Sequence, residues 1–138
     1  DRWLALLAVK ARGENSAVII DVGTACTIDV LENDQHLGGY IFPGLALARD
    51  ALIANTDKIR VFEDCEPSTS LGTCTSACVL SGVWLALLSA CQNVIDRFPH
   101  ATVYLTGGLA PELAALGLEA QRVDGLIFDG LDFWLDGA

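Results

Sequence analysis

The chain is poor in basic residues, with eight Lys and Arg against 18 Asp and Glu and a formal net charge of −10. Such a surface repels nucleic-acid phosphates and anionic lipids, so direct binding of DNA or of a membrane is not expected. We expect no apolar run of transmembrane length, because the longest one, around 83–88, is interrupted soon after by Ser89, Cys91 and Gln92. We also expect no signal peptide at the start of the sequence.

The five cysteines lack the paired CxxC spacing of a zinc site and are odd in number. We therefore expect small, buried thiols in a reducing cytoplasm, with Cys74 and Cys78 on one face of a helix. Hydrophobic residues make up 52% of the 138 positions, which is enough for one compact domain with a core.

What the sequence does contain is an alternation of strand and helix patterns. Strands are expected at 17–21, 26–31, 36–42, 102–105 and 120–123, and helices at about 3–12, 43–55, 73–97, 110–116 and 126–135, with an irregular segment at 56–70. This order predicts an α/β fold, a mixed sheet with flanking helices, as in one lobe of the actin-like and sugar-kinase-like (ribonuclease H-like) ATPases. Such an analogy of fold does not determine function.

A glycine turn separates two apolar strands in "VIIDVGTACTIDVL", residues 18–31. Glycine lets the backbone turn tightly and approach a ligand, and consecutive amide N–H groups in such a turn bind anions. The Thr24 hydroxyl adds a donor, and the Asp21 carboxylate can hold the cation that phosphate chemistry needs. An ordinary β-turn with a solvent-facing Asp21 is the alternative. The sequence assigns no role to Asp29.

Two other glycine segments carry weaker signals. The turn Thr106-Gly107-Gly108 follows an expected strand and leaves room for a phosphate or a flat ligand, although a structural turn is the alternative. The glycines of "HLGG", residues 36–39, stand within a strand, where glycine often marks a bulge or a close backbone approach. His36 itself fits an ordinary surface histidine.

Two helix starts carry polar side chains. Thr73 is a candidate N-cap of the long helix, and Thr75 could present its hydroxyl to a ligand at the positive helix end, although capping alone is the alternative. Asp1 and Arg2 open the first helix, where a favourable end charge would also explain them.

In their order these segments resemble the type III pantothenate kinases, the first enzymes of coenzyme A synthesis. That family carries GxDRW, IDxGTAxTxD, HLGGxIxPG, a GxxT segment that opens a helix, and a TGG turn. This chain has "DRWLALLA", "IIDVGTACTIDVL", "HLGGYIFPG", "LGTCTSACVLSG" and "YLTGG", and its tail "LIFDGL" is similar to the family's last helix. The resemblance spans essentially all 138 residues.

The sequence departs from the family pattern in two places. The family's N-terminal half, with its own DxGN[ST] phosphate loop, is absent, and so is the glycine expected two residues before Asp1. The resemblance therefore implies that residues 1–138 form a single C-terminal kinase lobe. Because one phosphate loop belongs to the other lobe, we expect these residues alone to be inactive.

The resemblance implies a role for each matching residue. Asp1 falls on the family's proton acceptor, and Arg2 falls in its pantothenate-binding segment. Asp21 falls on the monovalent-cation position, which takes potassium or ammonium. Thr24 matches an ATP-binding threonine and Thr75 a pantothenate-binding one.

Glycines complete the implied nucleotide site. Gly23, next to Thr24, belongs to the turn that would hold the ATP phosphates, and Gly107 and Gly108 lie in the turn expected near the nucleotide. The implied reaction transfers a phosphoryl group from ATP, with Mg²⁺, to pantothenate and yields 4'-phosphopantothenate.

Family members are dimers with the pantothenate site at or near the subunit interface. Trp84, Leu85, Leu87 and Leu88 stand together in the long helix, which predicts a homodimer through 73–97, with core filling as the alternative. Two other functions stay open. Some proteins that resemble this family are described as accessory transcription factors, which would act here through protein partners. Another kinase or chaperone of the superfamily is disfavoured by the DRW and HLGG segments.

Overall fold

The structure is a computed structural model that describes residues 1–61 and 65–137. Five strands form one mixed sheet in the order β3-β2-β1-β4-β5. The elements are α1 (Arg2–Ala11), β1 (Ala17–Val22), β2 (Ala25–Glu32), β3 (Gln35–Pro43), α2 (Leu45–Asn55), α3 (Thr75–Arg97), β4 (Thr102–Thr106), α4 (Ala110–Ala115), β5 (Gln121–Arg122) and α5 (Leu126–Leu135). The predicted mixed sheet with flanking helices is confirmed.

Strand β1 lies at the centre of the sheet. It pairs antiparallel with β2, which pairs antiparallel with β3, and it pairs parallel with β4 on its other side. The parallel pairing sets Asp21 opposite Thr106, although 85 positions separate them in the numbering (106 − 21). The Gly23–Thr24 turn after β1 and the TGG turn after β4 therefore follow neighbouring strand ends at one edge of the sheet.

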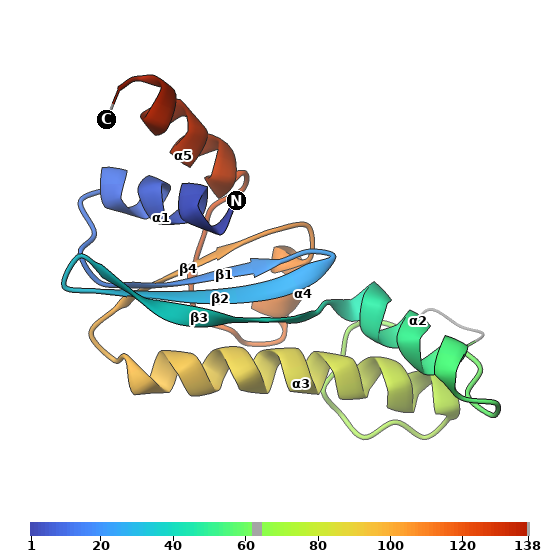
Figure 1. The fold of residues 1–138 in the computed structure, drawn as a ribbon. Coiled ribbons are helices and arrows are strands. Elements are labelled where there is room, and N and C mark those ends of the chain that lie inside the picture. The colour runs from blue at the N-terminus through green and yellow to red at the C-terminus, as the bar shows by residue number, and fades with distance from the viewer. Residues whose placement is uncertain (62–64, 138) are drawn as a thin grey trace.

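Helices cover both faces of the sheet (Figure 1). Because strand side chains alternate between faces, Val18 and Ile20 join the core formed with α3 and α4, whereas Ala17 and Ile19 join the core under α1 and α5. Asp21 is two residues beyond Ile19 and so belongs to the α1 and α5 face. Helix α2 continues from the end of β3 and contacts α3.

Helix α3 corrects the expectation about transmembrane length. By length and composition α3 could cross a membrane, since its mean hydropathy is 1.7 over an 18-residue window. The polar residues of its second half interrupt the apolar run, but the mean hydropathy of the window stays high. One such helix is weak evidence, since a core helix passes the same test. Trp84, Leu87, Cys91 and Val94 of α3 are buried in the core against the sheet.

Three finer predictions about α3 are wrong. The N-cap of α3 is Cys74 and not Thr73. Cys74 therefore precedes the helix that contains Cys78, so the two do not lie within one helix. Both thiols are exposed and not buried. Trp84 and Leu87 fill the core and are only 2% and 1% exposed, so they cannot contribute to a dimer surface.

Other sequence-based expectations, about exposed Leu85, the buried cysteines and the irregular segment, agree with the structure. Leu85 is 51% exposed, as a surface contact requires, and Cys26 and Cys91 are buried, as predicted for small apolar thiols. The irregular segment predicted at 56–70 has no helix or strand in its described part, and residues 62–64 lie outside the described residues.

Candidate functional site

Two turns and the start of α2 meet at the end of the central strands. The Gly44 N–H donates to the Thr24 carbonyl at 2.9 Å, and the Leu109 N–H donates to the Val22 carbonyl at 3.0 Å. These two bonds join the β1–β2 turn to the start of α2 on one side and to the TGG turn on the other. The turn that carries Gly23 and Thr24 is therefore held in place by backbone contacts from both neighbours.

Glycine is required where these turns touch. A Cβ on Gly44 would lie 2.2 Å from the Gly23 carbonyl oxygen, and a Cβ on Gly107 would lie 2.4 Å from the Val22 carbonyl oxygen. Gly107 also has a φ of +102°, which L side chains rarely adopt. At these two positions glycine makes room for another segment of the chain, and the ligand expected at the turns stays a prediction.

Asp21 lines a cavity of about 470 Å³. The lining residues come from β1, the TGG turn, α4 and the start of α5: Asp21, Thr106, Gly107, Gly108, Pro111, Asp124, Gly125, Leu126, Ile127 and Phe128. Three predicted site residues, Asp21, Gly107 and Gly108, are therefore brought together. Gly23 and Thr24 do not line this cavity but belong to the turn directly after Asp21.

Asp21 fits a bound cation. Its carboxyl is half-buried, burial raises its pKa, and within residues 1–61 and 65–137 it forms no ion pair or side-chain hydrogen bond. A desolvated carboxylate without a cationic partner is stabilised by a cation that binds it. In the part of the chain that the structure describes, no group of three or more His, Cys, Asp or Glu side chains could hold a metal ion by itself. A cation here would need ligands from a bound phosphate or from water.

The start of α5 is a part of this cavity that sequence reasoning missed. Gly125 is the N-cap of α5 with a left-handed φ of 67°, and Phe128 is 69% exposed beside the cavity. The pair Asp124-Gly125 before an apolar run is a turn signal that could have indicated this corner. Nothing in the sequence, however, places it beside Asp21.

A second polar cluster forms at the start of α1. Arg2 donates from Nε to Asp29 Oδ2 at 2.9 Å and from Nη2 to Asp29 Oδ1 at 2.6 Å, while His36 Nε2 lies 2.8 Å from Asp29 Oδ1. Asp29 is only 3% exposed. Asp1 precedes Arg2 as the exposed N-cap of α1 and makes no side-chain capping bond.

The charges of this cluster support one another. Burial acts to raise the pKa of Asp29, but the hydrogen bonds from Arg2 and His36, together with the positive charge of Arg2, outweigh it and hold that pKa below its ordinary value. The hydrogen bond to Asp29 in turn raises the pKa of Arg2. Gly39 faces Asp29 across the β2–β3 ladder, and a Cβ there would lie 2.6 Å from Asp29 Oδ1. The HLGG segment thus makes room for Asp29 and supplies one of its partners.

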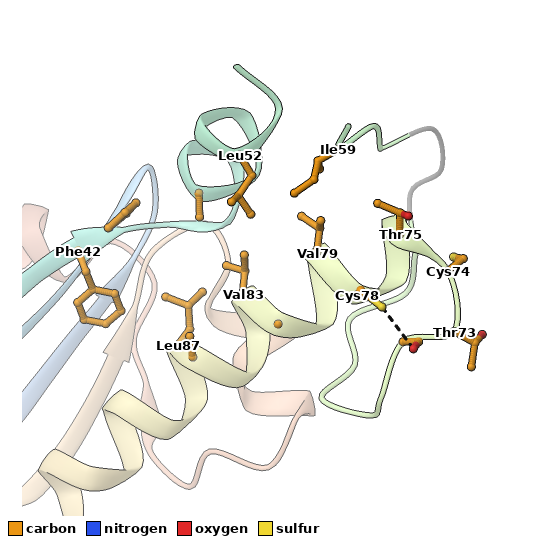
Figure 2. A pocket seen from close by; sticks show the side chains of 15 residues that line it. Phe42, Leu52, Ile59, Thr73, Cys74, Thr75, Cys78, Val79, Val83 and Leu87 are labelled. Atoms are coloured by element: carbon orange, nitrogen blue, oxygen red, sulfur yellow. Dashed lines mark hydrogen bonds between the residues drawn. The ribbon is translucent and has the colours of Figure 1, made fainter. Parts of the chain in front are cut away.

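Thr75 lies apart from both groups. It lines a different cavity, of about 800 Å³, between α2 and α3, where Leu52 and Ile59 point toward Val79 and Val83 (Figure 2). Helix α3 covers the sheet face opposite to α1, so one chain does not bring Thr75 to Asp1 and Arg2. Among the described residues, no other predicted site residue lines this mainly apolar cavity.

Comparison with known proteins assigns the family. The family model described as type III pantothenate kinase matches residues 1–97, which is more than half of the chain. The chain belongs to the type III pantothenate kinase family. The match covers the N-terminal 97 residues of this chain, so the tail "LIFDGL" lies outside it.

Individual type III pantothenate kinases match more of the chain than the family model does. The enzyme of Marinobacter nauticus is 40% identical over 136 residues, which are 96% of this chain and 56% of that protein. The enzyme of Acinetobacter baylyi is 46% identical over 118 residues, which are 83% of this chain and 46% of that protein. The chain spans about half the length of the curated relatives it matches.

Solved structures confirm the fold class. A putative Baf family transcriptional activator from Campylobacter jejuni superposes with a TM-score of 0.70 at 26% identity, covering 99% of this chain and 62% of that one. A putative 2-dehydro-3-deoxygalactonokinase from Sinorhizobium meliloti gives a TM-score of 0.59 at 18% identity, covering 94% of this chain and 56% of that one. The second likeness concerns the fold alone. Together they match the predicted lobe of the actin-like and sugar-kinase-like ATPases.

Asp21→Asn is expected to stabilise the protein at pH 7 when potassium, ammonium and nucleotide are absent. Burial raises the pKa of Asp21 in the folded state, so its contribution to stability is full below the ordinary value of 3.8 and is lost as the pH rises through the raised pKa. The Asn variant avoids that loss. Thermal unfolding from pH 3 to 7 checks this, with a melting-temperature gain at pH 7 that disappears near pH 3. A variant less stable than the parent at pH 7 would contradict it.

Proposed function

We propose that this chain is part of an enzyme that phosphorylates pantothenate with ATP, the first step of coenzyme A synthesis. The observation that carries the proposal is the cavity at the sheet edge, where Asp21, Gly107 and Gly108 meet beside the Gly23–Thr24 turn. It occurs in a chain that belongs to the type III pantothenate kinase family. The similar relatives named after this activity are 40% and 46% identical to it.

The proposed chemistry depends on positioning and on neutralised charge. Backbone N–H groups of the glycine turns would face the ATP phosphates, with the Thr24 hydroxyl as a further donor. Asp21 would hold potassium or ammonium, and Mg²⁺ bound with ATP would neutralise the phosphate charge. Asp1, which is exposed and free of a capping bond, would accept the proton of the pantothenate hydroxyl. Arg2 would bind the same substrate.

A homodimer is the second part of the proposal. Thr75 lies across the sheet from Asp1 in one chain, so a partner subunit is a simple way to bring its hydroxyl to the substrate. Apolar side chains of β3, α2 and α3 are available for such an interface: Tyr40, Ile41, Leu47 and Leu85 are 50%, 61%, 47% and 51% exposed. The cytoplasmic location predicted from the cysteines stays a prediction.

The place of the chain within a whole kinase also stays a prediction. The chain covers 46–56% of the length of these relatives, but that figure does not say which part of a relative it matches. The C-terminal lobe is implied by the family resemblance. We call "intact kinase" a protein that contains this chain together with the other lobe that the resemblance implies. Because ATP would lie between two lobes, residues 1–138 alone are expected to release no ADP in the presence of pantothenate.

Potassium dependence tests the proposed site. The intact kinase is expected to release ADP with pantothenate in potassium or ammonium, and to do so poorly in sodium alone. Asp21→Ala should weaken ATP binding and reduce the response to potassium, because it removes the proposed cation ligand. Asp124→Ala, at an exposed carboxylate of the same cavity, is the matched control and should keep that response. Equal activity in sodium alone would count against the cation site.

A role as an accessory transcription factor is the second candidate. The structural likeness to a putative Baf family transcriptional activator favours it. The net charge of −10 argues against direct contact with DNA, which leaves action through a protein partner. An intact protein that binds no ATP and turns over no pantothenate would favour this alternative.

A further inference from the structure

We propose that Asp29 is a positioning residue, which fixes the Arg2 guanidinium so that one defined edge of it meets the carboxylate of the substrate. This inference rests on the proposed function, because it takes pantothenate as the ligand of Arg2. It adds a residue for which the sequence offered no role.

The hydrogen bonds determine which edge of Arg2 is available. A guanidinium has five N–H groups, and Asp29 takes the one on Nε and one on Nη2. The second N–H on Nη2 and one of the two on Nη1 form the edge opposite to the side chain, while the other N–H on Nη1 points back along the side chain. The Arg2 side chain is 38% exposed while that of Asp29 is 4% exposed. The remaining edge can therefore reach a ligand, and it matches the two oxygens of a carboxylate.

Asp29 is itself firmly placed. It lies in the middle of β2, between Ile19 on β1 and Gly39 on β3, and His36 forms a further hydrogen bond to Oδ1. The missing side chain at Gly39 leaves the space that the carboxylate occupies. Because strand pairing and these partners fix the carboxylate, the carboxylate can fix the guanidinium.

Stability alone is a weak reason for this arrangement. A buried ion pair often stabilises a fold no better than apolar side chains of similar volume, and the same sheet face nearby is occupied by the buried Ile19 and Leu31. A charged pair instead fixes a cation on Arg2, the residue that follows Asp1, the proposed proton acceptor. The ion pair gives the Arg2 guanidinium a precise orientation. Precision matters in a catalytic site, since a misplacement of 1 Å can cost about 100-fold in rate.

Asp29→Asn in the intact kinase separates positioning from structure. The amide keeps the size of the side chain but not its charge or its two acceptor oxygens, so Arg2 loses its fixed orientation. We expect the KM for pantothenate to rise by about 10- to 100-fold, with the KM for ATP unchanged. In the Arg2→Lys background, which cannot form the two-pronged contact, Asp29→Asn should add little further effect.

Glu14→Gln is the matched control. Glu14 also accepts two side-chain hydrogen bonds, from Thr102 at 3.1 Å and Tyr104 at 2.9 Å, but it lies outside the proposed site. It should leave both KM values unchanged. If Asp29→Asn does not fold, His36→Ala serves instead, since His36 is exposed: a smaller rise in the pantothenate KM alone supports the inference, and an unchanged value overturns it.

The outcomes distinguish the inference from the proposed function. A parent that phosphorylates no pantothenate overturns the proposed function, and the role of Asp29 with it. An active parent whose Asp29→Asn variant folds and keeps its pantothenate KM overturns the positioning role alone. Equal rises in both KM values would show a general structural role and would also overturn it.

Discussion

Asp1→Asn is expected to lower the turnover of the intact kinase by about 10²- to 10⁴-fold, the usual contribution of a general base. ATP binding should change little, because the proposed nucleotide cavity is lined by Asp21 and the TGG turn and not by Asp1. The helix start should also survive, since the Asp1 side chain makes no capping bond and Asn is an equally good N-cap residue.

Steady-state kinetics and ATP titration of the same preparation check this expectation. Asp132→Asn is a suitable control, because Asp132 is an exposed carboxylate on α5 that lines neither cavity. It should match the parent in both measurements. Turnover of Asp1→Asn within about twofold of the parent, far below the usual effect of losing a general base, would remove Asp1 from that role.

Gly107→Ala is expected to have the largest effect on stability and on the nucleotide cavity together. The new Cβ would lie 2.4 Å from the Val22 carbonyl oxygen and 2.6 Å from Asp21 Oδ1, and the backbone φ of +102° is itself strained for alanine. Strain of this kind costs about 1–3 kcal/mol, and the displaced contacts add to it. The melting temperature should fall by about 3–10 °C, and ATP affinity should fall because Asp21 moves.

The neighbouring glycine supplies the control for that experiment. A Cβ on Gly108 would face open space, with none of the described residues within 4 Å of it, and the φ of Gly108 is not positive. Gly108→Ala should therefore unfold within about 1 °C of the parent. Thermal unfolding of both variants side by side isolates the contact between Gly107 and the end of β1. Equal melting temperatures for the two variants would contradict the importance of that contact.

The order and type of the elements could be predicted because each has a strong local pattern. Short apolar runs rich in β-branched residues mark β1 and β2, and the helical period marks α1 and α3. Finer details depend on tertiary contacts that no local pattern carries. Trp84 and Leu87 of α3 look the same in sequence as the exposed Leu85, and only the packed sheet separates them.

The candidate site could be predicted only in part, for the same reason. Asp21 and Thr24 stand in a recognisable glycine turn, but Asp29 does not, because its partners Arg2 and His36 lie 27 and seven residues away. The contribution of α5 to the cavity depends on how the chain returns after β5. Long-range placement of this kind follows from strand pairing and helix packing rather than from any short motif.

Product identification by mass spectrometry is the most direct test of the proposed activity. The intact kinase, supplied with ATP, Mg²⁺, potassium and pantothenate, is expected to yield 4'-phosphopantothenate and ADP in equal amounts. The same reaction with Asp1→Asn should yield almost none of either. ADP formed without phosphorylated pantothenate, or no turnover from a folded parent that contains both lobes, would contradict the assignment of this chain to pantothenate phosphorylation.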